Sequence, residues 1–237
     1  IRKIPEWFEY EGDGYLSRHS TLESNGDSLV DSYARIYELS GSRMQVLSAR
    51  HSLSIVGSDK NLLIKQDTVS YIACQSPVIS GRWYVPATVT SHDGGGRVQS
   101  TKEILIRDDY GNPIEIVTNH SEHVIYLWGY YGQRLVAQIK GATYVEVENA
   151  LGTSPVSLSQ LFSPVSTISG LQARLPGAQV YTYTYHPYAG VDSETAPNGQ
   201  TTCYDYDAKG RLVKSYRTEE NGKQEILQLN NYHIINE

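Results

Sequence analysis

Several stretches of the chain repeat one pattern, in which aromatic residues at alternate positions precede a short polar turn that ends in glycine. The clearest copy is YDYDAKGRL at residues 204–212. Residues 126–134 keep the spacing with Trp128 in the second aromatic position, residues 107–113 keep the acidic turn, and residues 183–190 form a looser copy. Self-similarity of this kind indicates a repeat architecture. We therefore expect each copy to be one β-hairpin unit.

The repeated pattern has a direct physical interpretation. Side chains at alternate positions of a strand lie on one face, so the paired tyrosines can cover neighbouring hairpins. Asp207 can accept backbone N–H bonds at the start of its turn, and Gly210 can adopt positive φ without steric cost. Because a single hairpin is marginal in water, such units must join edges or stack. The pattern predicts a mainly β fold of serial antiparallel hairpins in an open twisted or curved sheet.

The rest of the chain supports this fold with one interruption. Strong β formers between clusters of Gly, Asn, Asp and Ser predict strands at residues 32–39, 44–55, 62–72, 83–90, 98–107, 114–118, 124–130, 134–140 and 180–185. Residues 143–175 instead space their apolar side chains by three and four, which predicts two or three short helices. Residues 1–28 are expected to be irregular, apart from a strand that could start at Trp7.

These patterns divide the chain into four segments. Residues 1–90 are expected to be a β-rich region without a clear motif. Residues 91–142 carry hairpin repeats, and residues 143–175 form the helical insertion. Residues 176–237 then continue the hairpin repeats to the last residue.

Composition limits the classes of function. The formal net charge is −6, and basic residues are not clustered as nucleic-acid binding requires. No run of about 18 apolar residues is present, so no segment of the chain is expected to span a membrane. Nineteen Tyr beside two Phe and one Met suit a half-covered sheet better than a compact enzyme core. Cys74 and Cys203 are too few for a disulfide framework and are expected to be unpaired thiols.

The motifs resemble those of the RHS/YD-repeat family, most clearly at residues 124–139 and 175–212. The resemblance implies hairpins wound into a β-shell, in a bacterial protein that is extracellular or at the cell surface. The positions that match its structural repeat are Asp108, Gly111, Tyr126, Trp128, Gly132, Tyr183, Tyr185, Tyr204, Tyr206, Asp207, Gly210 and Arg211.

The sequence also departs from this family. The autoproteolytic core segment and the C-terminal toxin domain are not found, so the family's toxin-enclosing role is not carried over. We expect the C-terminal fragment of a repeat array. The first residues have no hydrophobic segment of the kind found in a signal peptide, so export is inferred from the resemblance alone.

No group of residues predicts catalysis, a metal or a cofactor. His120 and His123 flank a hairpin loop without a third ligand, so we expect a solvated turn. Asp205 and Asp207 could resemble the paired carboxylates of a glycosidase, but their place in the repeat predicts turn capping for both. Residues 94–96 lack the Lys and Ser/Thr of a phosphate-binding loop. We therefore expect a protein that is not an enzyme.

The aromatic side chains leave two functions open. The leading hypothesis is a non-catalytic structural or interaction module of a larger surface-exposed or secreted protein. Its partner would be the remainder of that repeat protein, or another protein, bound at the sheet edges. The alternative is a carbohydrate-binding module in which exposed rings stack on sugars. The candidate ligand-facing rings are Trp128, Tyr130, Tyr131, Tyr183 and Tyr188, and the opposing interpretation is that they pack hairpin against hairpin.

Overall fold

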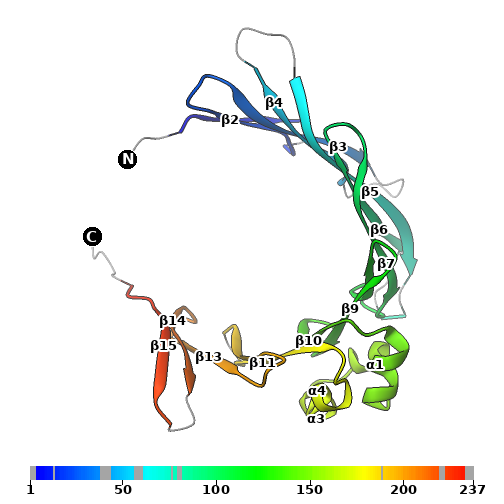
Figure 1. Cartoon of the computed structure of the whole chain (residues 1–237), viewed down its shortest axis with the longest axis vertical. Helices are drawn as coiled ribbons and strands as arrows, with labels where there is room; N and C mark the ends of the chain where they lie inside the picture. Colours follow the sequence, from blue (N-terminus) through cyan, green and yellow to red (C-terminus); the bar gives the residue numbers. More distant parts are fainter. Residues whose placement is uncertain are drawn as a thin grey trace. The chain divides into compact units, whose positions relative to one another are not determined.

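The computed structural model describes residues 4–12, 14–37, 44–55, 61–75, 77–78, 82–187, 189–218 and 222–232. In this part of the chain, the strands form one 15-stranded sheet whose order follows the sequence from β1 to β15 (Figure 1). This is the order that serial hairpins produce. Four short helices interrupt the series between β10 and β11. The expected fold class, mainly antiparallel β in an open sheet with helices near residues 143–175, is confirmed.

The elements have the following bounds. The strands are β1 (Glu6–Tyr10), β2 (Leu16–Leu22), β3 (Ser28–Tyr37), β4 (Met44–Ser54), β5 (Asn61–Gln75), β6 (Arg82–Asp93), β7 (Val98–Arg107), β8 (Pro113–Thr118), β9 (Glu122–Gly129), β10 (Arg134–Lys140), β11 (Gln179–Tyr185), β12 (Val191–Thr195), β13 (Thr201–Tyr206), β14 (Leu212–Thr218) and β15 (Gln224–Leu229). The helices are α1 (Tyr144–Leu151), α2 (Pro155–Leu158), α3 (Val165–Ile168) and α4 (Leu171–Arg174).

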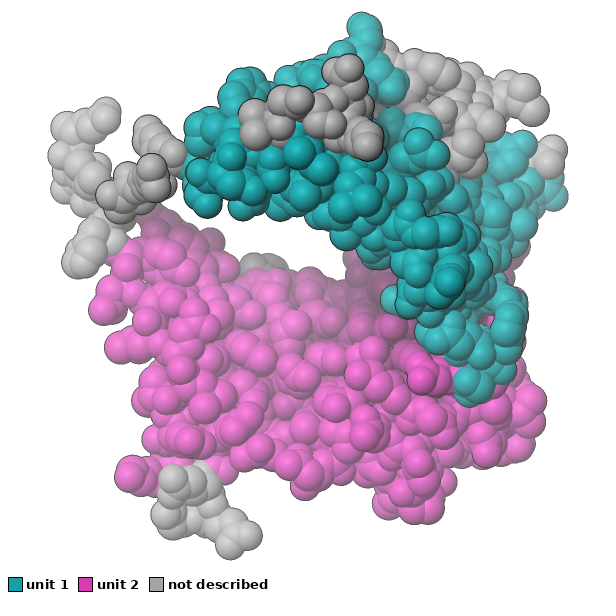
Figure 2. All heavy atoms as spheres, turned by 45° about the horizontal axis from the view of Figure 1, so that its top comes forward, with its two compact units in different colours: residues 1–76, 80–104, 117–121 teal, residues 77–79, 105–116, 122–237 magenta. Residues whose placement is uncertain are grey.

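The chain divides into two compact units, which Figure 2 shows in teal and magenta. Unit 1 comprises residues 1–76, 80–104 and 117–121, and unit 2 comprises residues 77–79, 105–116 and 122–237. Unit 1 therefore holds β1 to β6 and most of β7. Unit 2 holds the four helices and β9 to β15, together with most of β8.

Unit 1 begins with a hairpin that the sequence did not predict. β1 agrees with the strand that could start at Trp7, but it pairs antiparallel with β2, so the expectation that the rest of residues 1–28 is irregular is wrong. The turn between these strands starts at Glu11, whose N–H donates to the carbonyl of Tyr15 at 2.8 Å. The N–H of Gly14 donates back to the carbonyl of Glu11 at 2.9 Å, with φ of 86° at Gly14. Glutamate therefore stands where the recognised repeats have aspartate, and the cross-strand ladder fixes the strands despite a weak local pattern.

Polar pairs link the first strands of unit 1. The register places His19 opposite Asp31 and Asp31 opposite His51. Nδ1 of His51 lies 2.5 Å from a carboxylate oxygen of Asp31. On the other side of the row, the ring of Phe8 stacks on His19 with ring centroids 4.6 Å apart. Cross-strand pairs of this kind stabilise a sheet with little apolar burial.

Unit 2 contains an apolar core between one face of its sheet and the helices. Side chains from the sheet and from the helices have no or almost no exposed surface, which is the packing expected of a domain core. The buried core residues are Ile114, Ile125, Leu127, Val136, Ala137, Ile139, Ala142, Val147, Leu151, Leu158, Ile168, Leu171, Leu175, Ala178 and Val180. Because strand side chains alternate, Tyr126 and Tyr181, which neighbour core residues on β9 and β11, lie on the opposite face of the sheet, whereas a bulge in β10 lets both Val136 and Ala137 face the core.

The ends of the helices follow local capping rules. Thr143 accepts from the N–H of Glu146, whose carboxylate accepts from the N–H of Thr143, so α1 opens on a reciprocal capping box. Gly152 ends α1 with φ of 71°. Gly170, with φ of 69°, separates α3 from α4. The structure consequently has four short helices where the sequence predicted two or three.

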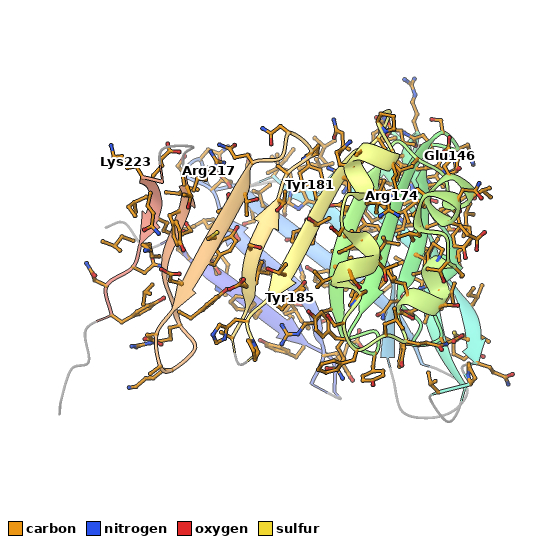
Figure 3. All side chains as sticks on the ribbon, turned by 90° about the horizontal axis from the view of Figure 1, so that it is seen from below. Glu146, Arg174, Tyr181, Tyr185, Arg217 and Lys223 are labelled. Atoms are coloured by element: carbon orange, nitrogen blue, oxygen red, sulfur yellow. The ribbon has the colours of Figure 1, made fainter. Side chains whose placement is uncertain are left out.

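Arg174 joins the ends of three helical segments. Its guanidinium donates to the carbonyl oxygen of Ala150 at 2.5 Å, of Thr167 at 3.1 Å and of Ser169 at 2.8 Å. Carbonyl groups at helix ends lack partners within the helix, so one arginine satisfies several of them. Figure 3 marks Arg174 and Glu146 on the helices of unit 2.

Candidate functional site

Three hairpin turns use an aspartate in the same way. Oδ1 of Asp207 accepts from the backbone N–H groups two and four residues later, those of Lys209 and Arg211, each at 2.9 Å. Asp93 accepts from the equivalent N–H groups at 2.9 Å and 2.9 Å. Asp108 does so at 3.0 Å and 2.8 Å. These side chains hold the turn backbone, which is the role of an aspartate at the first turn position.

In the Asp207 and Asp108 turns, the second carboxylate oxygen contacts the side chain that follows the turn glycine, whereas Oδ2 of Asp93 accepts from Nε2 of Gln99 at 3.0 Å. Oδ2 of Asp207 accepts from Nε and from Nη2 of Arg211, each at 2.7 Å. Oδ2 of Asp108 accepts from Nδ2 of Asn112 at 3.0 Å. This geometry gives a physical reason for the Arg or Asn that follows glycine in the repeat, because a charged or amide donor completes the cap.

The two caps differ in their electrostatics. Hydrogen bonds from the backbone and side chain of Arg211 hold the pKa of Asp207 below its ordinary value, and the side chain is half-buried. Burial raises the pKa of Asp108, and the hydrogen bonds from Asn112 and Tyr110 only partly oppose this. The same turn motif therefore has two electrostatic environments. The stability contributed by its aspartate consequently changes with pH in opposite directions in the two turns.

Glycines in the repeat leave room for tyrosine rings. A Cβ atom at Gly132, where φ is 73°, would overlap the ring of Tyr110. A Cβ atom at Gly190 would lie 2.5 Å from the hydroxyl of Tyr206. That hydroxyl donates to the carbonyl of Val191 at 2.8 Å. The absence of a side chain at these glycines therefore lets a ring from a neighbouring hairpin lie against the turn.

The predicted ligand-facing aromatics do not lie together. Trp128 is half-buried against the core, and its Nε1–H donates to the carbonyl of Pro113 at 2.8 Å. Tyr130 and Tyr131 form the β9–β10 turn, Tyr183 lies on β11, and Tyr188 is outside the described residues. The four described rings therefore occupy three different places in unit 2.

The β9–β10 turn places two tyrosines in the left-handed region. Tyr130 has φ of 53° and Tyr131 has φ of 59°, a conformation that is costly for a bulky residue. The rings of both lie against Phe162, with centroids 6.0 Å and 6.2 Å away. Tyr130 also contacts Tyr185, over which Arg134 lies at 4.7 Å. Phe162 was not among the predicted ligand-facing aromatics, because its contact with this turn depends on how the helical segment packs.

A second aromatic group lies on the sheet face opposite the helices. The register places Tyr126 and Tyr181 on either side of Gln138, and Tyr183 beside Glu194. Tyr204 is on the same face, and its hydroxyl donates to Glu194 at 3.5 Å. We call Tyr126, Tyr181, Tyr183 and Tyr204 the tyrosine face; Figure 3 labels Tyr181 on β11. Alternation along each strand could have grouped Tyr181 with Tyr183, but the position of Glu194 depends on strand register.

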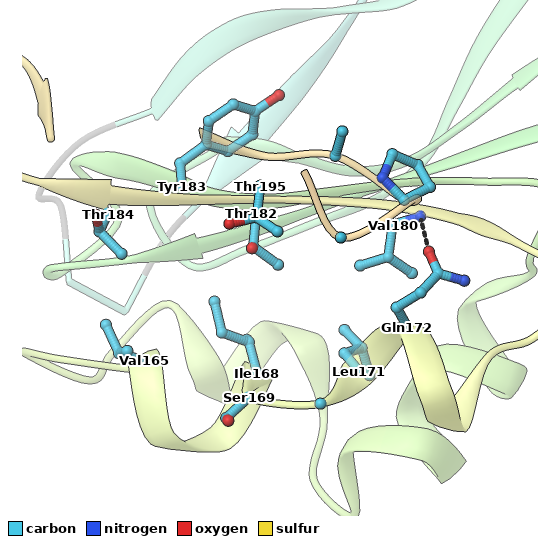
Figure 4. A pocket seen from close by; sticks show the side chains of 14 residues that line it. Val165, Ile168, Ser169, Leu171, Gln172, Val180, Thr182, Tyr183, Thr184 and Thr195 are labelled. Carbon is cyan, nitrogen blue, oxygen red and sulfur yellow. Dashed lines mark hydrogen bonds between the residues drawn. The ribbon is translucent and has the colours of Figure 1, made fainter. Parts of the chain in front are cut away.

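A groove lies between the helices and the other face of β11. It has a volume of about 330 Å³ and is lined by α3, α4, β11 and the β12–β13 turn. Ile168 and Leu171 approach the strand from the helices, as Figure 4 shows, while Val180 and Thr182 face them from β11. Sequence analysis did not predict this groove, because it depends on how the helices pack on the strand.

The groove has little electrostatic character. Among the described residues that line it, Tyr183 alone has an ionisable side chain. Burial, followed by the charge of neighbouring Glu194, raises the pKa of Tyr183 to about 12. The hydroxyl is therefore protonated at neutral pH, and its ring points away from the helices in Figure 4. The groove carries no formal charge.

The other predicted ionisable groups have separate partners. Asp207 caps its turn, but Asp205 instead forms an ion pair with Lys214 at 2.9 Å, which corrects the expectation that both aspartates cap the turn. Asp205 projects from the strand two residues before the turn, too early to reach the turn N–H groups. His120 pairs with Glu103 at 3.0 Å, whereas His123 pairs with the buried Glu115 at 2.8 Å.

The two cysteines lie in different units of the chain. Cys74 and Cys203 are free thiols in the structure. Burial raises the pKa of Cys203, with a further increase from the charges of Asp192 and Asp205, which disfavours the reactive thiolate. Within the described ranges, no group of three or more His, Cys, Asp or Glu residues has a metal-binding arrangement. Within these same ranges, no helix has the length and apolar character needed to cross a membrane.

Comparison with known proteins gives limited information. No family model matches the chain, and no curated protein matches it. The Tc holotoxin pore of Photorhabdus luminescens is similar with a TM-score of 0.36 and 10% identity, over 98% of this chain and 12% of that chain. A porin-like protein from Bacteroides uniformis is similar with a TM-score of 0.29 and 11% identity, over 88% and 91% of the two chains. Similarity at this level supports no conclusion about function.

Proposed function

We propose that the chain is a non-catalytic structural and interaction module of a larger hairpin-repeat protein that is secreted or surface-exposed. The observation that carries this proposal is the exposed apolar surface of unit 1. Only Val30, Val85 and Val117 are buried among its described hydrophobic residues. Its exposed large hydrophobics are Ile4, Trp7, Phe8, Tyr10, Tyr15, Ile55, Leu62, Ile64, Ile72 and Val98. In this proposal, a partner covers part of these exposed apolar side chains.

The sheet edges indicate how a partner would bind. Among the described strands, β1 and β15 each have a single neighbour, so one backbone edge of each is unpaired. All residues of both strands are exposed. Strand edges are usually protected by lysine or proline, yet neither residue occurs within β1 or β15. The partner in this proposal is a β-strand from another repeat or another protein, which extends the sheet by backbone hydrogen bonds.

The described carboxylates support the non-catalytic part of the proposal. Asp93, Asp108 and Asp207 hold turns, and Asp205 pairs with Lys214. None of the described residues that line the groove in unit 2 has a carboxylate, imidazole, thiol or amine. General acid–base chemistry needs such groups to converge on a substrate.

Sedimentation velocity at increasing protein concentration tests whether the edge strands pair, with a second copy of the chain as the partner. We expect reversible association that is weakened by Phe8→Lys on β1 and by Leu227→Lys on β15, because a charge on an edge strand opposes pairing. Leu105→Lys is the matched control, since Leu105 is comparably apolar and exposed but lies on the inner strand β7 and outside the apolar surface of unit 1. A chain that stays monomeric, or that responds equally to all three variants, would contradict edge pairing.

Carbohydrate binding is the second candidate, and the tyrosine face favours it. Tyr183 and Tyr204 flank Glu194, and Arg217 lies across from Thr202 in the same cross-strand row. Half-exposed rings beside carboxylate and guanidinium groups can combine stacking with hydrogen bonds to sugar hydroxyls. This arrangement uses Tyr183 but not the other four predicted rings.

A glycan array distinguishes this second candidate. We expect binding to be lost in Tyr183→Ala and kept in Tyr216→Ala, which removes a ring from the opposite face of the same sheet. A blank array, or equal loss in both folded variants, would reject carbohydrate binding at the tyrosine face.

A further inference from the structure

We propose that the groove between α3–α4 and β11 binds a neutral, mainly apolar small molecule. This site is separate from the sheet edges, and it lies on the face of β11 opposite the ring of Tyr183. The groove lies within unit 2, and its volume of about 330 Å³ is at the lower end of the range of ligand pockets. An apolar cavity of roughly 150 Å³ can already hold benzene. The ligand is therefore expected to have one or two rings.

The lining determines the chemical class of the ligand. Val165, Ile168, Leu171 and Val180 provide apolar walls, with further apolar surface from the β12–β13 turn. A charged ligand would lose its hydration without gaining an ion pair, because no lining residue carries a charge at neutral pH. A neutral ring system would instead gain the hydrophobic contribution of its buried surface.

One hydroxyl gives the groove a polar anchor. Thr182 shares a strand face with Val180 and points toward the helices in Figure 4. Its hydroxyl has no hydrogen-bond partner within the described part of the chain. In contrast, the hydroxyl of Thr184 is within 2.7 Å of Ser193, and that of Thr195 is within 2.9 Å of Thr201. A ligand hydroxyl or carbonyl is expected at Thr182.

The groove walls are held in place without a ligand. Oε1 of Gln172 on α4 accepts from the N–H of Val180 at 2.9 Å. Nε2 of Gln172 donates to the carbonyl of Ala178 at 3.0 Å. These bonds fix α4 to the start of β11, and Ile168 and Leu171 are part of the core. Because the walls are preformed, little binding energy is lost in ordering them.

Three probes of similar size and different charge test the proposal: benzyl alcohol, benzoate and benzylamine. Methyl chemical shifts of Ile168, Leu171 and Val180 in the whole chain report binding at the groove. We expect saturable shifts with benzyl alcohol and a Kd of about 1 mM, as suits so small a ligand. Binding of the two charged probes is expected to be at least roughly tenfold weaker.

Two variants locate the binding site. Ala196→Phe places a ring in the groove from the β12–β13 turn, whereas the control Ala208→Phe adds the same ring to the next hairpin turn, outside the groove lining. Thr182→Val removes the free hydroxyl and keeps the shape. We expect Ala196→Phe to abolish binding, Ala208→Phe to leave it unchanged, and Thr182→Val to weaken it about fivefold.

The outcomes decide the proposal. Selective binding of benzyl alcohol that is lost in Ala196→Phe supports it. Equal affinity for the three probes, no saturable shift, or unchanged binding in a folded Ala196→Phe variant would overturn it. If Ala196→Phe does not fold, unchanged affinity in Thr182→Val would overturn it instead.

Discussion

Unit 1 and unit 2 are built from the same kind of hairpin but solve the problem of burial differently. In unit 2, the helices cover one face of the sheet, and residues such as Ile125 and Leu127 have no exposed surface. In unit 1, the described strands have few buried side chains and are joined by backbone ladders and polar pairs such as Asp31–His51. Hairpin repeats therefore provide a sheet, whereas a stable core requires a second layer.

The strongest contrast is expected from truncating one leucine in each unit. Leu127→Ala should destabilise unit 2 by about 2–5 kcal/mol, because it leaves a cavity in a packed core. Leu62→Ala in unit 1 should change stability by less than about 0.5 kcal/mol, because Leu62 is 58% exposed. Urea denaturation monitored by circular dichroism measures both. Similar effects of the two substitutions would contradict the difference in burial.

Turn glycines provide the next contrast. Gly14→Ala should cost about 1 kcal/mol, because only its positive φ is unfavourable and no atom lies within 4 Å of the added Cβ. Gly132→Ala adds overlap with Tyr110 and should cost roughly 2–3 kcal/mol. Thermal unfolding compares them. An equal cost would show that the Tyr110 ring moves away freely.

The capping aspartates give a smaller, pH-dependent effect. The pKa of Asp207 is lowered on folding, so its ionised cap is fully stabilising above about pH 4 and is lost as pH falls through the folded pKa. Asp207→Asn should therefore lower the melting temperature at pH 7 and have less effect in acid. Melting curves from pH 7 to about pH 3 measure this. A pH-independent difference would reject an ionised cap.

The pH dependence of the stability contributed by Asp108 is expected to have the opposite sign. Burial raises its pKa, so the folded chain binds more protons than the unfolded chain between about pH 4 and the folded pKa. Wild-type stability relative to Asp108→Asn should consequently decrease as pH rises through this window. The same melting series tests it, and parallel curves for the Asp108 and Asp207 variants would contradict their different environments.

Most of the strands could be predicted because their signals, β-forming residues between turn residues, lie within short stretches of the sequence. The predicted segments 98–107 and 134–140 coincide with β7 and β10. The end of the predicted strand 32–39 lies outside the described residues. A strand starting near Trp7 was expected, but β2 and its pairing with β1 were missed because Glu11 replaces the aspartate of the recognised turn, although Gly14 keeps the spacing. A search for Asp or Glu three residues before glycine would have found this turn.

The candidate sites could be predicted only in part. The aspartate caps could be predicted, because each aspartate accepts from N–H groups only two and four residues later in the same turn. The tyrosine face needs the register of β11 against β12, and the groove needs the packing of α3 and α4 on β11. These long-range relations depend on tertiary packing, which a single sequence does not display. The strained Tyr130–Tyr131 turn likewise contradicts the residue preferences of hairpin turns.

Amide hydrogen exchange of the free chain tests the central claim most directly, namely that unit 2 has its own core while unit 1 relies on a partner. We predict slow exchange in β9, β10 and β11, because their backbone bonds lie beside the buried core, and fast exchange in β1, β2 and β3. Self-association at high concentration should then protect β1. Equal protection of both units in the dilute chain would contradict this account.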